Sequence, residues 1–211
     1  MPDFNINRVL MMVIPVLLAL TVHEYAHGLA AWKLGDNTAK NAGRLTLNPL
    51  SHLDPLGTLM IFFSGLFGWA KPVPFDPRNF KNPVRDTTLV ALAGPLANLV
   101  TAVVLALLFR LALHLGLLDL IDLYSKGFII LIIWELAIRI NILLCIFNLL
   151  PLPPLDGFKV LSYFLPHKYI IMAYEKQIVF LVIFVVLVAT GTLGKIIGPI
   201  IQGFLAFLIG W

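Results

Sequence analysis

Residues 9–34 read VLMMVIPVLLALTVHEYAHGLAAWKL, an apolar stretch with His23, Glu24 and His27 inside it. A helix needs about 20 apolar residues to cross the hydrocarbon core of a bilayer, and this stretch is long enough. It has no small-residue cleavage site, so we interpret it as a membrane span and not as a signal peptide. Ionisable groups within a span are costly and usually mark a function.

The composition of the whole chain agrees with a membrane location. Of its 211 residues, 60% are hydrophobic and 12% are charged, whereas a typical soluble domain has about 45–50% apolar and about 25% charged residues. Most of the surface must therefore meet lipid. The single cysteine, Cys145, excludes a disulfide-stapled secreted domain. The net charge of +4 is spread over loops, without the basic run that would suggest nucleic-acid binding.

Further apolar stretches at residues 88–113, 128–150, 172–190 and 196–211 are long enough to be spans. Residues 59–69 are apolar but too short to cross at about 1.5 Å of rise per residue, so we expect them to dip into the membrane and return. The alternation in Arg44-Leu45-Thr46-Leu47 predicts a short strand. The sequence thus predicts an all-α polytopic membrane protein with about five transmembrane helices, a short re-entrant segment and a small membrane-associated β element.

Lysines and arginines predict the orientation. Segments 33–57, 71–86 and 151–176 hold ten of the 15 basic residues, whereas segment 114–126 holds only Lys126. If residues 59–69 return without crossing, the three basic segments share one face, which the positive-inside rule makes cytoplasmic. The N-terminus then lies outside.

His23-Glu24-Tyr25-Ala26-His27 is an H-E-x-x-H motif on a predicted helix. Its spacing places both imidazoles on one helical face, within reach of one tetrahedral zinc ion. Glu24 lies about 100° around the helix from His23, so it can contact a metal-bound water without occupying a coordination position. This is the arrangement that a general base requires.

A catalytic zinc ion needs a third protein ligand. The acidic residues and the remaining histidines, His52, His114 and His167, are the candidates. Asp156 is the sole charge in residues 148–157, NLLPLPPLDG, whose prolines cannot continue a helix. The expected topology brings Asp156 to the face of the histidine pair and His114 to the opposite face. Asp156 could instead cap the following helix; His52 could bind zinc in its place, contact substrate or fix the turn before the dip; and His167 is expected to be solvated.

With these residues identified, the chain resembles the site-2 protease family of intramembrane zinc metalloproteases. The resemblance rests on H-E-x-x-H at 23–27, on Gly94-Pro95-Leu96-Ala97-Asn98 and on Asn-x-x-Pro-x-Pro-x-x-Asp-Gly at 148–157. Residues 47–50, LNPL, and 68–74, GWAKPVP, are similar to a compact bacterial and archaeal branch. We expect one membrane-embedded domain over residues 1–211, with a catalytic core at about 9–165 and a C-terminal helical pair at about 172–211, and without the PDZ or CBS domain of many relatives.

The resemblance implies one zinc ion per chain, held by His23, His27 and Asp156, and cleavage of peptide bonds within or near the transmembrane segments of membrane proteins. Glu24 would be the catalytic base. Asn148 and then Asn98 are the candidate donors to the oxyanion, although each could instead bridge helices.

The expected partners are transmembrane protein substrates and the lipid bilayer, with no nucleic acid. We expect a multi-pass protein of the plasma membrane whose active site lies toward the cytoplasm. Residues 44–47 and 69–74 are expected to pair with an extended substrate, as in strand addition. Glu135 and Arg139 have the spacing of a helical ion pair. A zinc-binding membrane transporter, another zinc hydrolase and an inactive protease-like scaffold are the alternatives.

Overall fold

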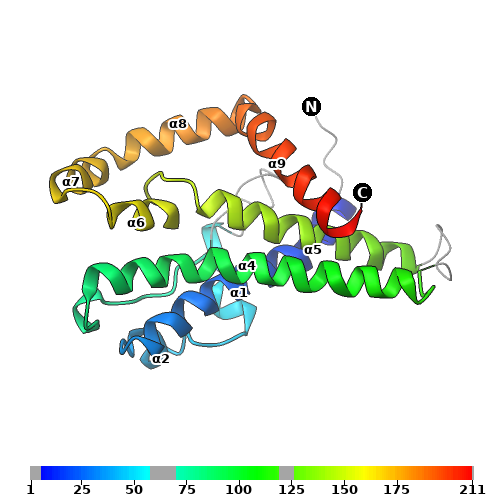
Figure 1. Cartoon of the computed structure of the whole chain (residues 1–211), viewed down its shortest axis with the longest axis horizontal. Coiled ribbons are helices and arrows are strands. Elements are labelled where there is room, and N and C mark those ends of the chain that lie inside the picture. The colour runs from blue at the N-terminus through cyan, green and yellow to red at the C-terminus, as the bar shows by residue number, and fades with distance from the viewer. Residues whose placement is uncertain (1–5, 58–69, 119–125, 211) are drawn as a thin grey trace.

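The computed structural model describes residues 6–57, 70–118 and 126–210. Three long helices lie alongside one another in the centre of the molecule: α1 (Ile6–Lys33), α4 (Pro83–His114) and α5 (Lys126–Asn148) (Figure 1). The shorter elements are α2 (Thr38–Asn41), η1 (Pro49–His52), η2 (Pro77–Asn79), α6 (Asp156–Ser162) and α7 (His167–Glu175). The chain ends with α8 (Gln177–Ala189) and α9 (Thr192–Ile209).

The described residues form an all-α polytopic membrane fold. Helices α1, α4, α5 and α9 are each long and apolar enough to cross a bilayer. Helices α7 and α8 meet at a bend of 62° and together pass the same test, so the described part of the chain has four spans, or five if the bent pair is one. The spans predicted at 9–34, 88–113 and 128–150 correspond to α1, α4 and α5.

Small residues of α4 let its neighbours approach closely. Ala102 and Ala106 are fully buried, and they pack in one cluster with Ile138 and Ile142 of α5. Helix α9 joins this cluster through every fourth residue, which places its contacts on a single helical face; these residues are Ile197, Ile201, Leu205 and Ile209. Helix α8, by contrast, has no buried residue.

The connection between α1 and α4 begins and ends at the same end of the bundle (Figure 1). The fully buried carboxylate of Asp36 fastens it there, because it accepts hydrogen bonds from the Asp76 amide at 2.9 Å and from the Asn79 side chain at 2.7 Å. The dip predicted at residues 59–69 lies outside the described residues. Its flanks are adjacent, since Leu53 and Ala70 form an antiparallel β-bridge.

The prediction of a strand at residues 44–47 is wrong. Residues 45–47 form bends, Arg44 has no regular structure, and the Leu53–Ala70 bridge is isolated, with no sheet among the described residues. Two backbone groups that a strand would offer to a neighbour are taken elsewhere: the Thr46 carbonyl accepts from His52 Nε2 at 2.8 Å, and the Arg44 amide donates to the Ala39 carbonyl at 2.9 Å. Residues 44–47 therefore present no strand edge to a substrate.

Candidate metal centre

Two distant segments bring three ligand-type side chains together. His23 and His27 lie one turn apart on α1, and Asp156 is the first residue of α6. The Nε2 atoms of the two histidines are 3.0 Å apart, and they lie 3.2 and 3.1 Å from Asp156 Oδ2. All three side chains are buried. No other such group of three or more metal-ligating side chains occurs among the described residues.

The hydrogen bonds of the imidazoles assign their protons. Asn98 Oδ1 lies 2.7 Å from His23 Nδ1, while the Asn98 amide nitrogen donates to the Ala19 carbonyl and to Asn141 Oδ1, each at 2.9 Å. Both Asn98 hydrogens are therefore in use, and its oxygen must accept from His23 Nδ1. Likewise, His27 Nδ1 lies 2.7 Å from the Val90 carbonyl, which can only accept. Each ring thus gives its Nδ1 hydrogen to a partner outside the site and directs Nε2 toward Asp156.

The size of this triangle suits zinc. Tetrahedral zinc with bonds of about 2.0–2.1 Å needs ligand atoms about 3.3 Å apart, and the observed separations are 3.0 to 3.2 Å. Lys159 Nζ lies 3.0 Å from Asp156 Oδ1, which leaves Oδ2 to face the histidines. The Lys159 ammonium also favours the charged form of the Asp156 carboxyl, which is the form that binds a metal.

Two glycines allow the surrounding backbone to come this close. A Cβ atom on Gly94 of α4 would overlap the His27 ring and lie 2.7 Å from His23 Cε1. A Cβ atom on Gly157 would overlap the Leu149 carbonyl. The first glycine seats α4 against both imidazoles, and the second lets the chain after α5 fold back so that Asp156 reaches them.

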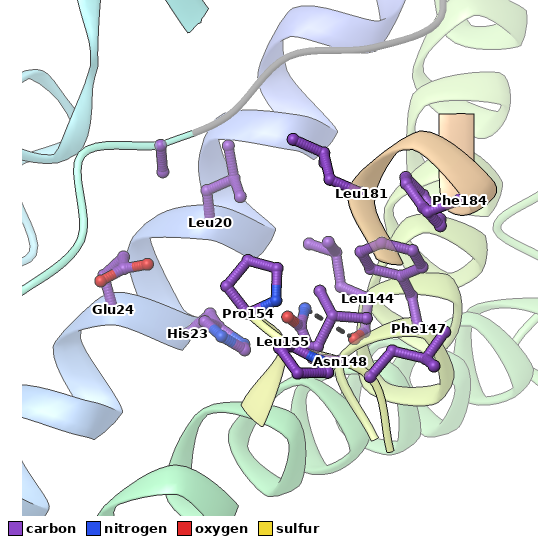
Figure 2. Close-up of a pocket in the computed structure, with 13 residues that line it drawn as sticks. Leu20, His23, Glu24, Leu144, Phe147, Asn148, Pro154, Leu155, Leu181 and Phe184 are labelled. Atoms are coloured by element: carbon purple, nitrogen blue, oxygen red, sulfur yellow. Dashed lines mark hydrogen bonds between the residues drawn. The ribbon is translucent and has the colours of Figure 1, made fainter. Parts of the chain in front are cut away.

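Glu24 lies beside the ligands, on a pocket of about 250 Å³ between α1, α5 and α8 (Figure 2). Its Oε2 accepts the Val73 amide hydrogen at 2.7 Å. His23, Glu24 and Asn148 supply the polar lining, and the rest is apolar, including Leu20, Leu144, Phe147, Leu181 and Phe184. The pocket therefore has the Glu24 carboxylate and the candidate ligand His23 on one wall, and it has room for an apolar group beside them.

The two asparagines proposed as oxyanion donors have different surroundings. Asn98 joins α4 to α1 and α5 with both amide hydrogens, so it has none to donate to an oxyanion and acts as the helix bridge that was its alternative. Asn148 lines the pocket and gives one hydrogen to the Leu144 carbonyl at 3.0 Å (Figure 2). Among the described residues, no acceptor takes its second hydrogen.

The remaining histidines lie away from the centre. His52 is buried in η1 and bonds to the Thr46 carbonyl, which fits the turn-fixing role. His114 is the exposed last residue of α4, at the end away from Val90 and Gly94, and His167 is exposed. The Glu135–Arg139 pair is confirmed at 2.8 Å.

The sequence analysis missed two groups that bind site residues: the Asn141 side chain, which bonds to Asn98, and the Val73 N–H, which bonds to Glu24. Asn141, fully buried on α5, accepts from Asn98. An amide within an apolar span was the available signal for Asn141. The Val73 N–H is a backbone group, and backbone groups have no sequence signature.

Comparison with known proteins identifies the same family as the motifs. The model of peptidase family M50 matches residues 121–190, which include Asn148 and Asp156. YwhC of Bacillus subtilis (strain 168) is 43% identical over 155 residues, covering 74% of this chain and 69% of YwhC. Rip2 of Mycolicibacterium smegmatis is 31% identical over 188 residues, covering 82% of this chain and 64% of Rip2.

A more distant relative is MJ0611 of Methanocaldococcus jannaschii, which is 28% identical over 162 residues, covering 77% of this chain and 74% of that protein. All three relatives bear the name of a candidate zinc metalloprotease. No solved structure matches the chain. The motifs and these relatives lead to one conclusion: the chain belongs to peptidase family M50.

Proposed function

We propose that the chain is an intramembrane zinc metalloprotease of the site-2 type, which hydrolyses peptide bonds within or near transmembrane segments of membrane proteins. The observation that supports this function best is the meeting of His23 Nε2, His27 Nε2 and Asp156 Oδ2 within 3.0 to 3.2 Å, beside Glu24 and inside a bundle of membrane-spanning helices. One zinc ion per chain fits this donor set.

Each site residue then has a chemical task. His23, His27 and Asp156 would hold the zinc ion, which would supply an activated water and positive charge at the scissile carbonyl. Glu24 accepts the proton of that water and delivers it to the leaving amine. Asn148 donates its second amide hydrogen to the carbonyl oxygen as negative charge develops there. Asn98 holds the proton of His23 on Nδ1 and so keeps Nε2 available as a ligand.

The pocket beside Glu24 is suited to one apolar side chain of the substrate. Its lining includes Phe147 and Phe184, whose ring centroids lie 5.2 Å apart. A peptide bond inside a helix is protected by the helix's own hydrogen bonds, so the substrate must be extended at the point of cleavage. Seating an apolar side chain next to Glu24 helps to hold it in that conformation.

We further propose a multi-pass plasma-membrane protein with five spans, in which α7 and α8 form one broken span. Residues 1–211 form one membrane-embedded domain, with its catalytic core at about 9–165 and its C-terminal helical pair at about 172–211. Helices α2 and α7 lie toward the end of the bundle where α1 ends and α4 begins (Figure 1). Lys40 belongs to α2, Lys168 belongs to α7 and Lys81 precedes α4, which supports a cytoplasmic orientation of that end.

The test compares purified wild-type protein with Glu24→Gln on a panel of single-span substrates, with and without a chelator. We expect Glu24→Gln to keep its zinc and lose cleavage, and the chelator to abolish wild-type cleavage. A metal transporter would keep zinc flux in vesicles after Glu24→Gln. Cleavage by Glu24→Gln at the wild-type rate would contradict the proposed function.

A further inference from the structure

Residues 70–73, which we name the strap, contact α1 at Glu24 and Gly28. The Lys71 amide donates to the His52 carbonyl at 2.9 Å, and the Lys71 carbonyl accepts from Arg44 Nη2 at 2.7 Å. Two residues later, the Val73 amide donates to Glu24 Oε2 at 2.7 Å. Three hydrogen bonds thus connect Arg44 and His52 to Glu24 through the strap backbone.

The strap is packed as well as bonded. The Val73 side chain is 6% exposed and lies over Gly28 of α1, where an added Cβ would be 3.2 Å from Val73 Cγ1. Prolines at 72 and 74 flank it, and their rings fix φ near −65°. The direction of the Val73 N–H therefore depends on where Lys71 is held.

The Arg44 side chain holds Lys71 in place through its hydrogen bond to the Lys71 carbonyl. Its residue is 8% exposed, and its guanidinium lies inside the loop instead of in solvent. His52 supports the same arrangement through its own backbone carbonyl, while its ring binds Thr46. Because a buried guanidinium donates in a fixed planar geometry, Arg44 can set the position of the Lys71 carbonyl more closely than a flexible lysine would.

We propose that Arg44 is a positioning residue for catalysis, acting through the strap to hold the Val73 N–H on Glu24 Oε2. This inference rests on the proposed function, since it needs Glu24 as the base. A glutamate side chain has several rotamers, and a bond to one oxygen leaves the other in a defined place for proton transfer. Misplacing a reacting group by about 1 Å can cost about 10²-fold in rate.

A direct test observes the Val73 amide. Labelling proline at the carbonyl carbon with ¹³C and valine with ¹⁵N isolates the valines that follow a proline, which are Val16, Val73 and Val84. We expect slow hydrogen exchange at Val73 in the wild-type protein. We expect about tenfold or faster exchange there in Arg44→Gln and in Glu24→Ala, with Val16 and Val84 unchanged.

The kinetic test separates positioning from folding. Arg44→Gln should lower kcat about 10- to 100-fold with unchanged KM and zinc content, and Arg44→Lys should restore part of the loss. Arg78→Gln is the matched control, because the Arg78 side chain is 89% exposed and pairs with Asp76. It should behave as wild type. A merely structural Arg44 would instead lower zinc content and thermal stability together with kcat.

The failures of the two proposals are distinguishable. If wild-type protein shows no zinc-dependent cleavage, the proposed function fails, whatever the exchange data show. If cleavage depends on zinc and Glu24, but Val73 exchange is unchanged in Arg44→Gln, the positioning role is overturned. Should Arg44→Gln not fold, the wild-type and Glu24→Ala measurements still decide: rapid exchange at Val73 in the wild type, or exchange unaffected by Glu24→Ala, overturns it.

Discussion

At the scale of single residues, the candidate site depends on where two protons lie. His23 and His27 give their Nδ1 hydrogens to Asn98 and to the Val90 carbonyl, and so present Nε2 to one point. Asn98, which accepts the His23 hydrogen, is itself fixed, because its amide nitrogen donates to the Ala19 carbonyl and to Asn141 Oδ1. Partners of this kind orient metal ligands and raise their basicity.

Substitution of Asn98 should therefore change zinc affinity, whereas substitution of Asn148 should change kcat. Asn98→Leu removes the acceptor of His23 and should weaken zinc binding about 10- to 100-fold, measured by competition with a chelator. Asn148→Leu should leave zinc affinity unchanged and lower kcat about 10²- to 10³-fold, the loss typical of an oxyanion donor. Equal zinc affinities in Asn98→Leu and wild type would contradict the role assigned to Asn98.

Gly94 offers a second test at this scale. Gly94→Ala inserts a methyl group where the two imidazole rings lie, so we expect loss of bound zinc, measured by metal analysis of the purified protein. Gly198→Ala in α9 is the control, because its added Cβ meets nothing within 4 Å. If Gly94→Ala binds zinc as wild type does, α4 does not seat the histidines as described.

Several site residues were predictable from the sequence because their types and spacing encode their geometry. The i, i+4 histidines must share a helical face, and Asp156 is the sole charge of a proline-rich exit. The role of Asn98 was not predictable, since an amide in an apolar span fits either an oxyanion donor or a helix bridge. The neighbours on α1 and α5 decide between them, and only the folded chain reveals those neighbours.

At the scale of elements, apolar length predicted α1, α4 and α5 well, because a bilayer sets the length of a span. The strand at 44–47 failed because four alternating residues are a weak signal that tertiary contacts override. There, Arg44 and His52 bind backbone carbonyls of neighbouring loops. The break between α7 and α8 falls at Lys176, inside the span predicted at residues 172–190.

The Asp36 carboxylate joins two of these elements, and its contribution should depend on pH. Burial acts to raise its pKa, but hydrogen bonds from Thr38, Asn79 and Asp76 outweigh burial and hold the pKa below its ordinary value. A lowered carboxyl pKa stabilises the folded state above the unfolded pKa of about 3.9, and this stabilisation is lost as pH falls through the folded pKa.

Asp36→Asn should therefore lower the free energy of unfolding by about 1–3 kcal/mol at pH 7. The difference from wild type should shrink as the pH falls below about 4. Thermal unfolding in detergent between pH 3 and pH 7 measures both effects. A difference that stays constant over this range would show that the charge of Asp36 is not what fastens the connection.

Helix α8 contributes Leu181 and Phe184 to the pocket, although it has no buried residue. Phe184→Ala should enlarge the pocket and shift the ratio of kcat/KM between large and small apolar substrate side chains by about 1–3 kcal/mol in favour of the large ones. Phe207→Ala on α9 is the control, because Phe207 is 80% exposed. An equal shift in both variants would mean that the pocket does not select the side chain.

At the scale of the whole molecule, the basic residues and the metal geometry agree on topology. The connection of α1 to α4 starts and ends at one end of the bundle (Figure 1), and α6 brings Asp156 to His23 and His27 of α1. With Cys145 replaced by alanine, single cysteines at Lys40, Lys81 and Lys168 should react with a membrane-impermeant reagent only from the cytoplasmic side. Reaction of any of them in intact cells would reverse or split the proposed orientation.

The metal ligands are separated by 129 residues, from His27 to Asp156. During synthesis, the histidine pair enters the membrane long before its carboxylate partner is translated, and two further helices must be inserted between them. A nascent chain therefore has only two of the three ligands and no assembled pocket. If these three side chains hold the metal as proposed, we expect no cleavage of neighbouring membrane proteins until α6 has docked.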